Sequence, residues 1–221
     1  MRKIYLAFFA ALLILFTACQ KEADFPPGQN PGNPNNPGNP GNPGNPSGQS
    51  IIGNYDFVGL TAHTIGTTTA NDGGDQIRTV TVSYYTSKNN TGTYTINATQ
   101  FISNNIGYSI DTTMNSKIYI NGVLTDDFDL PFQGTVPPAS NTVTYVKNTA
   151  DSLTVTGPVG PITGPSGTPP PTGAMGYKYS WSGDTLVLKT TASFTQNVNQ
   201  GGVQATVSQS ATVTARLKKK P

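Results

Sequence analysis

The stretch Val203–Leu217 reads VQATVSQSATVTARL, and it decides the fold. Every second residue is apolar except Gln209, while Thr, Ser and Gln fill most of the positions between. Because side chains of a strand point alternately to two faces, this pattern predicts a strand with one apolar face. At about 3.3 Å per residue the strand is near 50 Å long, which favours a strand bending around a barrel over a flat sandwich strand. We expect Gln209 to mark a bulge or a polar group in the interior.

The same alternation continues through most of the chain that precedes this stretch. No window of eleven or more residues has the apolar stripe of an amphipathic helix, so we expect an all-β domain. In Arg78–Thr86 the Thr and Ser side chains point away from three apolar ones. These apolar residues are Val80, Val82 and Tyr84. A second strand, around Tyr94, follows the KNNTG segment at Lys88–Gly92, which we expect to be a tight turn between two meander strands.

Asn121-Gly122 is the strongest short hairpin signal, because both central residues of a type I′ turn need positive φ. A two-residue loop places Ile120 opposite Val123 and Tyr119 opposite Leu124. It also places Lys117 opposite Asp126, as an exposed pair that contributes little to stability.

Gly183-Asp184 predicts a second hairpin, with Gly in the first position that a type II′ turn prefers. The hairpin places three aromatic residues on one face, namely Tyr177, Tyr179 and Trp181. Such a ladder is more often core than a binding surface. Its functional alternative is a platform that stacks on a sugar or an aromatic ligand, so these three are our candidate ligand-binding residues.

The first residues form a targeting segment. Arg2 and Lys3 precede an apolar run, Ile4–Phe16, which is too short to span a bilayer comfortably and fits a secretory signal. Thr17-Ala18-Cys19 resembles a bacterial lipobox with Phe16 in place of the usual Leu, which implies cleavage before Cys19 and its acylation. The alternative is an ordinary signal peptide with an incidental cysteine.

The residues after the cysteine sharpen the predicted address. Gln20, Lys21, Glu22 and Asp24 resemble the Lys-plus-acidic export signal of Bacteroidetes surface lipoproteins. This implies an outer-membrane protein, anchored through the lipid on Cys19 and exposed at the cell surface. The alternative is an ordinary solvated N-terminus.

The expected domain organisation has three parts. Residues 1–18 are the signal peptide, 19–49 carry the acylated cysteine and a spacer, and 50–221 form one β domain. The spacer is Pro26–Gln49, PPGQNPGNPNNPGNPGNPGNPSGQ, which has no apolar side chain to bury and should be extended and disordered. We expect the Pro- and Gly-rich stretch at 157–173 to be a long loop between strands.

Three short segments of the β domain carry a family resemblance: Ile52-Gly53-Asn54-Tyr55, GTYTI at Gly92–Ile96 and SGDTLVL at Ser182–Leu188. Together they resemble the lipocalin-like lipoproteins of Bacteroidetes, with Tyr55 where lipocalins have Trp. The resemblance implies an antiparallel up-and-down barrel of about eight strands with a cavity. It also implies an Arg over the opening aromatic residue, but the alternation points Arg216 outward. A β-sandwich is the alternative fold.

Composition limits the functions open to this chain. Thirteen basic against eleven acidic residues disfavour a nucleic-acid partner, and one Cys and one His disfavour zinc. His63 has no neighbouring nucleophile or carboxylate signal, while Asn71–Asp75 and Asp126–Asp129 lack calcium-loop spacing and should be a turn and a solvated strand edge. We therefore expect no enzyme, catalytic residue, cofactor or metal.

Two hypotheses follow from these observations. The first is a surface lipoprotein whose barrel binds a small hydrophobic molecule or another cell-envelope ligand. The second is a β-sandwich module that binds a glycan or a protein through the aromatic ladder.

Overall fold

The structure is a computed structural model that describes residues 49–157, 159, 173–200 and 203–221. These residues contain nine strands and no helix, which confirms the predicted all-β class, with one strand more than the expected number of about eight. The predicted signal peptide, Cys19, Gln20–Asp24 and the spacer up to residue 48 lie outside the described residues. Most of the 157–173 segment lies outside them as well. In the part of the chain that is described, no helix is long and apolar enough to cross a membrane.

All nine strands belong to a single sheet whose neighbours are antiparallel. In chain order they are β1 (Gly53–Asp72), β2 (Asp75–Thr86), β3 (Lys88–Ile96), β4 (Gln100–Ile120), β5 (Val123–Lys147), β6 (Ser152–Val155), β7 (Met175–Ser182), β8 (Thr185–Gln200) and β9 (Val203–Lys219). A β-sandwich needs two packed sheets, so the alternative fold is not the one adopted here.

The sheet closes into a ring because β9 pairs with β1 along most of its length, from Tyr55 opposite Lys219 to Ala70 opposite Ala205. Both β2 and β3 lie between β1 and β4: β2 pairs with their distal halves and β3 with the halves near Gly53 and Gln100. Because β2 and β3 follow one another in the gap between β1 and β4, the nine strands occupy eight positions around the ring. The predicted up-and-down, barrel-like architecture is therefore confirmed.

The expected tight turn at Lys88–Gly92 is wrong. The strands on either side, β2 and β3, run in the same direction and do not pair with each other. Positive φ at Asn89 (52°) and Gly92 (97°) bends the chain, and two side chains hold it against β1. The Ser87 hydroxyl accepts from the Leu60 amide at 2.8 Å, and the Asn90 amide donates to the Val58 carbonyl at 2.7 Å.

The turn that reverses the chain lies earlier, at Gly73-Gly74. Asp72 pairs with Asp75 across this two-residue loop, and the glycines have φ of 60° and 96°. The prediction that Asn71–Asp75 is a turn is confirmed.

The Asn121-Gly122 hairpin forms with φ of 51° and 82°, and Ile120 lies opposite Val123 as predicted. The expected Lys117–Asp126 pair is wrong. The register shifts between Ile118 and Tyr119, so that Lys117 lies opposite Asp127, 3.4 Å from Lys117 Nζ to the carboxylate. Thr125 is the extra residue of the bulge, and its hydroxyl donates a hydrogen bond to the Ile118 carbonyl at 3.0 Å.

The core occupies the end of the ring that β6 and β7 complete. Its fully buried side chains include Tyr55, Phe101, Leu186 and Leu217. The second predicted hairpin contributes to it, with Trp181 opposite Leu186 and Tyr179 opposite Leu188.

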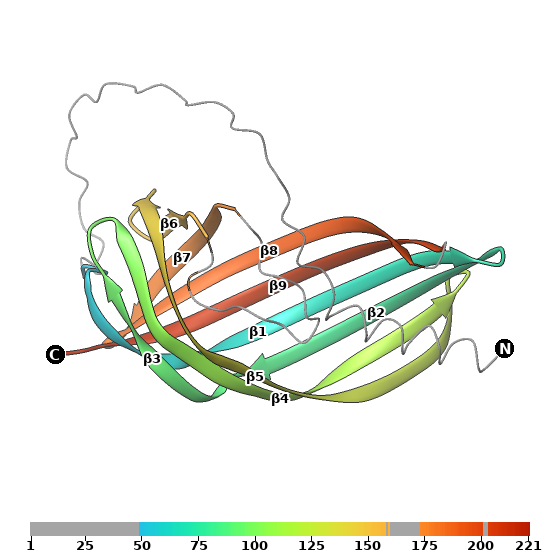
Figure 1. Cartoon of the computed structure of the whole chain (residues 1–221), viewed down its shortest axis with the longest axis horizontal. Helices are drawn as coiled ribbons and strands as arrows, with labels where there is room; N and C mark the ends of the chain where they lie inside the picture. The colour runs from blue at the N-terminus through green and yellow to red at the C-terminus, as the bar shows by residue number, and fades with distance from the viewer. Residues whose placement is uncertain (1–48, 158, 160–172, 201–202) are drawn as a thin grey trace, which may run out of the picture. The chain divides into compact units, whose positions relative to one another are not determined.

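Beyond this closed end the sheet is open. The strand β5 pairs with β6 only at Tyr145–Lys147, and β7 pairs with β8 only as far as Lys189. The long strands continue past these pairings in the order β5, β4, β2, β1, β9, β8, as a single layer with two free edges (Figure 1). Gln209 lies in this layer without a register shift, so it is a polar group on the inner face.

Candidate functional site

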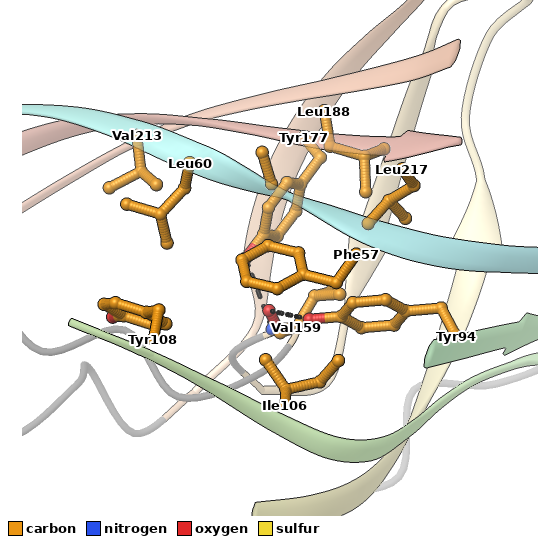
Figure 2. Close-up of a pocket in the computed structure, with 11 residues that line it drawn as sticks. Phe57, Leu60, Tyr94, Ile106, Tyr108, Val159, Tyr177, Leu188, Val213 and Leu217 are labelled. Atoms are coloured by element: carbon orange, nitrogen blue, oxygen red, sulfur yellow. Dashed lines mark hydrogen bonds between the residues drawn. The ribbon is translucent and has the colours of Figure 1, made fainter. Parts of the chain in front are cut away.

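The interior of the closed end is filled with side chains. Figure 2 shows Tyr94 and Tyr177 converging on Val159 amid Phe57, Leu188 and Leu217. The Tyr94 hydroxyl donates to the Val159 carbonyl at 3.5 Å, and the Val159 amide donates to the Tyr177 oxygen at 3.4 Å. The cavity that remains measures about 20 Å³, which is room for one water molecule. A ligand of drug size needs several hundred Å³, so it does not fit in this cavity.

Burial changes the chemistry of these tyrosines. Desolvation of the phenolate raises the pKa of Tyr177 to about 12 and raises the pKa of Tyr94 further. Both hydroxyls therefore stay protonated near neutral pH, where they serve as hydrogen-bonding groups of the core.

The aromatic ladder is part of the core. Tyr177 is 4% exposed and Tyr179 8% exposed, while Trp181 is half-buried with its ring centroid 6.4 Å from that of Tyr55. The interpretation of the ladder as core is thus confirmed for the two tyrosines. Tyr177 and Tyr179 offer no free ring face for stacking on a sugar.

Tyr55, in the opening segment, is fully buried, and its hydroxyl donates to the Ile51 carbonyl at 2.6 Å. Arg216 is exposed, as the alternation predicted, and does not cover Tyr55. A different cation lies near this aromatic pair, because the Lys219 ammonium is 5.7 Å from the centroid of the Trp181 ring.

The open layer has an apolar inner face, continuous with the barrel core. We call it the open inner face. Most of its apolar side chains are half-buried, and these are Ile77, Met114, Ile118, Ile120, Phe128, Leu130, Phe132, Ala192, Phe194, Val198, Val203 and Val207. Thr79, Thr81, Ser83 and Ser116 form a polar strip along its middle. Beyond the closed end, the strands that carry this face pair edge to edge in one sheet. Ser83 and Ser116 in its middle are buried at 2% and 1% exposure.

Two of the three acidic residues of β5, Asp127 and Asp129, lie elsewhere. Asp127 and Asp129 both accept from the Asn115 amide, at 2.8 and 3.1 Å, on the outer face of the sheet. The hydrogen bond from Asn115 is the main reason that the pKa of Asp127 lies below its usual value. No group of three or more His, Cys, Asp or Glu side chains among the described residues is arranged to hold a metal ion.

His63 lies on the outer face, stacked on Tyr84 with ring centroids 4.0 Å apart and planes 5° from parallel. Its Nε2 atom is buried and has no hydrogen-bond partner within the described residues. This contact joins β1 to β2, and sequence reasoning missed it because it depends on the register of strands that are 21 residues apart at this point.

No family model, curated protein or solved structure matches this chain. The structural class of the protein is therefore described from its own fold, which is an antiparallel ring of strands that is closed at one end and open at the other.

Proposed function

We propose that this chain is a lipid-anchored protein of the bacterial outer membrane that binds an apolar molecule of the cell envelope. The observation that supports the ligand class is the open inner face, a single-layered sheet surface rich in aromatic and aliphatic side chains. These side chains are only half-buried, and a contiguous apolar surface that stays partly exposed often marks an interaction site. The ligand is placed on this face because the cavity among Phe57, Tyr94 and Tyr177 at the closed end has room only for a water molecule.

The shape of the face favours a long, narrow ligand such as an acyl chain. Its apolar side chains run along both flanks, on β4–β5 and on β8–β9. Between Thr64 and Ala70 the open part of β1 extends for about 20 Å at the usual rise of a strand. Asp126 is the charged side chain of this face, and it lies at the far end next to the Asn121-Gly122 turn. A neutral hydrocarbon chain matches the rest of the surface.

The anchor rests on the resemblance of Thr17-Ala18-Cys19 to a lipobox. Acylation of Cys19 with two or more chains supplies the affinity that stable attachment requires. The Lys-plus-acidic residues after it support display at the cell surface. The Pro- and Gly-rich spacer then leaves the β domain free to meet its ligand in solution.

The proposal assigns no catalytic step to the chain. His63 is the single histidine of the sequence, and its ring stacks on Tyr84 instead of activating a nucleophile. The role is therefore one of binding.

Photocrosslinking in bacterial cells that export the protein tests whether an acyl lipid binds to the open inner face. A benzoylphenylalanine in place of Phe194, on the open inner face, is expected to form an adduct with an acyl lipid, which mass spectrometry identifies. The matched control places the same group at the neighbouring Thr195, on the outer face, where no lipid adduct is expected. Equal adducts at both positions, or none at Phe194, would contradict the proposed site.

Mass spectrometry of the membrane fraction tests the anchor separately. We expect a mature N-terminal peptide that begins at an acylated Cys19, and Cys19→Ala should remove the protein from this fraction. A secreted protein with an unmodified Cys19 would refute the anchor and leave the ligand proposal standing.

A further inference from the structure

A second surface, on the outer face of the sheet, has the features of a polar ligand site. It is a shallow depression of about 360 Å³, a volume within the range of small-molecule sites. Its floor and walls come from β8, β9, β1 and β2. The side chains that the argument uses are Thr61, His63, Tyr84, Thr86, Lys189 and Thr214. We call it the outer depression.

The register of the sheet explains how these residues meet. Thr61 lies opposite Thr86 on one side and Thr214 on the other, and Thr214 lies opposite Lys189. The hydroxyls of the three threonines therefore form a row across the sheet, and Lys189 is the next residue in that row. The next row on the same face contains His63 opposite Tyr84.

Tyr84 has an unusual environment for a large ring on a sheet. Its side chain is 66% exposed, and the parallel stack on His63 holds one face of the ring. A Thr112 hydroxyl bond to its backbone carbonyl, at 2.7 Å, fixes the strand beneath. A held and exposed ring suits the C–H face of a pyranose, because it loses little conformational freedom when the sugar binds.

The charges beside the depression point to an anionic group on the ligand. Lys189 lies directly opposite Lys178, and both are exposed. Like charges in a cross-strand pair destabilise the sheet. No carboxylate forms an ion pair with either lysine within the described residues, whereas Lys88, Lys117, Lys218 and Lys220 each have an aspartate partner. An anion bound beside Lys189 would remove this repulsion.

We propose that the outer depression binds an acidic saccharide. The sugar ring stacks on Tyr84, its hydroxyls bond to the threonines, and its carboxylate is held by Lys189. This inference is independent of the open inner face, because the depression lies on the opposite side of the sheet.

Calorimetric titration of the full lipid-anchored chain in nanodiscs tests this site. The probes are an oligouronate and a neutral oligoglucoside of the same length. We expect the uronate to bind, to bind less tightly as salt rises, and to exceed the neutral sugar about tenfold in affinity, as befits one charged hydrogen bond. Equal affinity for both sugars, or no binding of the uronate, would overturn the proposal.

Matched variants locate the site. Lys189→Gln should weaken uronate binding about tenfold, and Lys117→Gln, which removes an ion-paired lysine of the same face, should leave it unchanged. Tyr84→Ala should weaken the binding of both sugars, while Tyr84→Phe keeps the ring and retains binding. Lys189 and Lys117 lie on the surface, so their Gln variants should unfold close to the temperature of the parent chain. Tyr84→Ala also removes the stack on His63, so its unfolding temperature is measured beside its affinity, and Tyr84→Phe serves as the variant that keeps the stack. Equal losses for Lys189→Gln and Lys117→Gln would exclude the depression as the site.

Discussion

Buried tyrosines place hydroxyl groups inside a core that is otherwise mostly apolar. Tyr55, Tyr94 and Tyr177 each direct a hydroxyl to a backbone group in the interior. Satisfying a buried hydroxyl avoids the cost of leaving it without a partner. The same burial makes ionisation of these side chains unfavourable.

Alkaline pH should therefore destabilise the fold. The pKa of Tyr55 and that of Tyr177 are each raised from 10.0 to about 12 by desolvation. Above pH 10 the unfolded chain loses these protons before the folded chain does, so the free energy of unfolding falls as pH rises toward 12. Urea unfolding followed by Trp181 fluorescence, at about pH 9 and about pH 11, measures this loss. Tyr177→Phe should reduce the loss, and equal stability at both values would contradict the explanation.

Gly92 is the residue on which the bend between β2 and β3 depends. Its φ is 97°, and a β-carbon there would lie 2.4 Å from the carbonyl oxygen of Asn105. Both features exclude a side chain.

Gly92→Ala should lower the free energy of unfolding by about 2 kcal/mol or more, because strained φ and a backbone clash add up. Gly176→Ala is the control, since a β-carbon at Gly176 meets nothing within 4 Å. Urea denaturation compares the two variants, and similar losses in both would show that the bend tolerates a side chain.

At the scale of the strand, the residue types at a turn predicted where turns form better than they predicted which residues of two strands lie opposite each other. Asn121-Gly122 forms the expected hairpin because the two residues that need positive φ are adjacent in sequence. The Thr125 bulge beyond it was not predictable, since it depends on how β5 lies against β4. Lys88–Gly92 has the composition of a turn, but it only bends the chain between β2 and β3 without reversing its direction. The bend is held because Ser87 and Asn90 form hydrogen bonds with β1.

The two faces of β2 show the same limit. The alternation of Arg78–Thr86 correctly grouped Val80, Val82 and Tyr84 on one face. This face is the outer one, and Ser83 on the inner side is buried. Sequence could not assign the faces, because this part of β2 directs Thr79, Thr81 and Ser83 inward and the three apolar side chains outward, the reverse of its neighbour β4. For that reason the Tyr84–His63 contact was not foreseen.

The two free edges of the open layer differ. The strand β5 carries Pro131, Pro137 and Pro138 together with Asp127 and Asp129. Proline and charge block the addition of another strand. The free edge of β8, from Thr191 to Val198, contains neither.

Self-association should therefore begin at β8. Thr195→Lys places a charge on this edge and should raise the protein concentration at which light scattering appears. Ser208→Lys is the control, because Ser208 lies opposite Thr195 on β9, whose two sides are already paired. Equal protection by both substitutions would attribute the effect to net charge alone.

In the β domain as a whole, stability should be graded from the closed end to the open layer. The fully buried Leu217 and Leu186 face each other at the closed end, while the distal parts of the long strands have half-buried side chains. The sequence showed the long alternating strands. It did not show the graded burial, because the ring closes only where the short β6 and β7 complete it.

Native-state hydrogen exchange should resolve this gradient. Amides of Leu186 and Leu217 should exchange only on global unfolding, and those of Thr191–Val198 should exchange much faster through local opening. Leu217→Ala should cost about 2–5 kcal/mol, whereas Val207→Ala, in the open layer, should cost less than about 1 kcal/mol. Uniform protection along β8 would contradict the gradient.

The pairing of the chain's first and last strands also has a mechanical consequence. β1 is the first strand of the described residues, and it is flanked near Gly53 by β3 and along its length by β9. The Lys220 amide adds a bond to the Asn54 carbonyl at 2.8 Å. A pull on the N-terminus is directed along β1, across the hydrogen bonds of two ladders. These bonds share the load in shear and do not open one after another. The first strand of the described domain should therefore resist being pulled out of the sheet more than a strand at a free edge would.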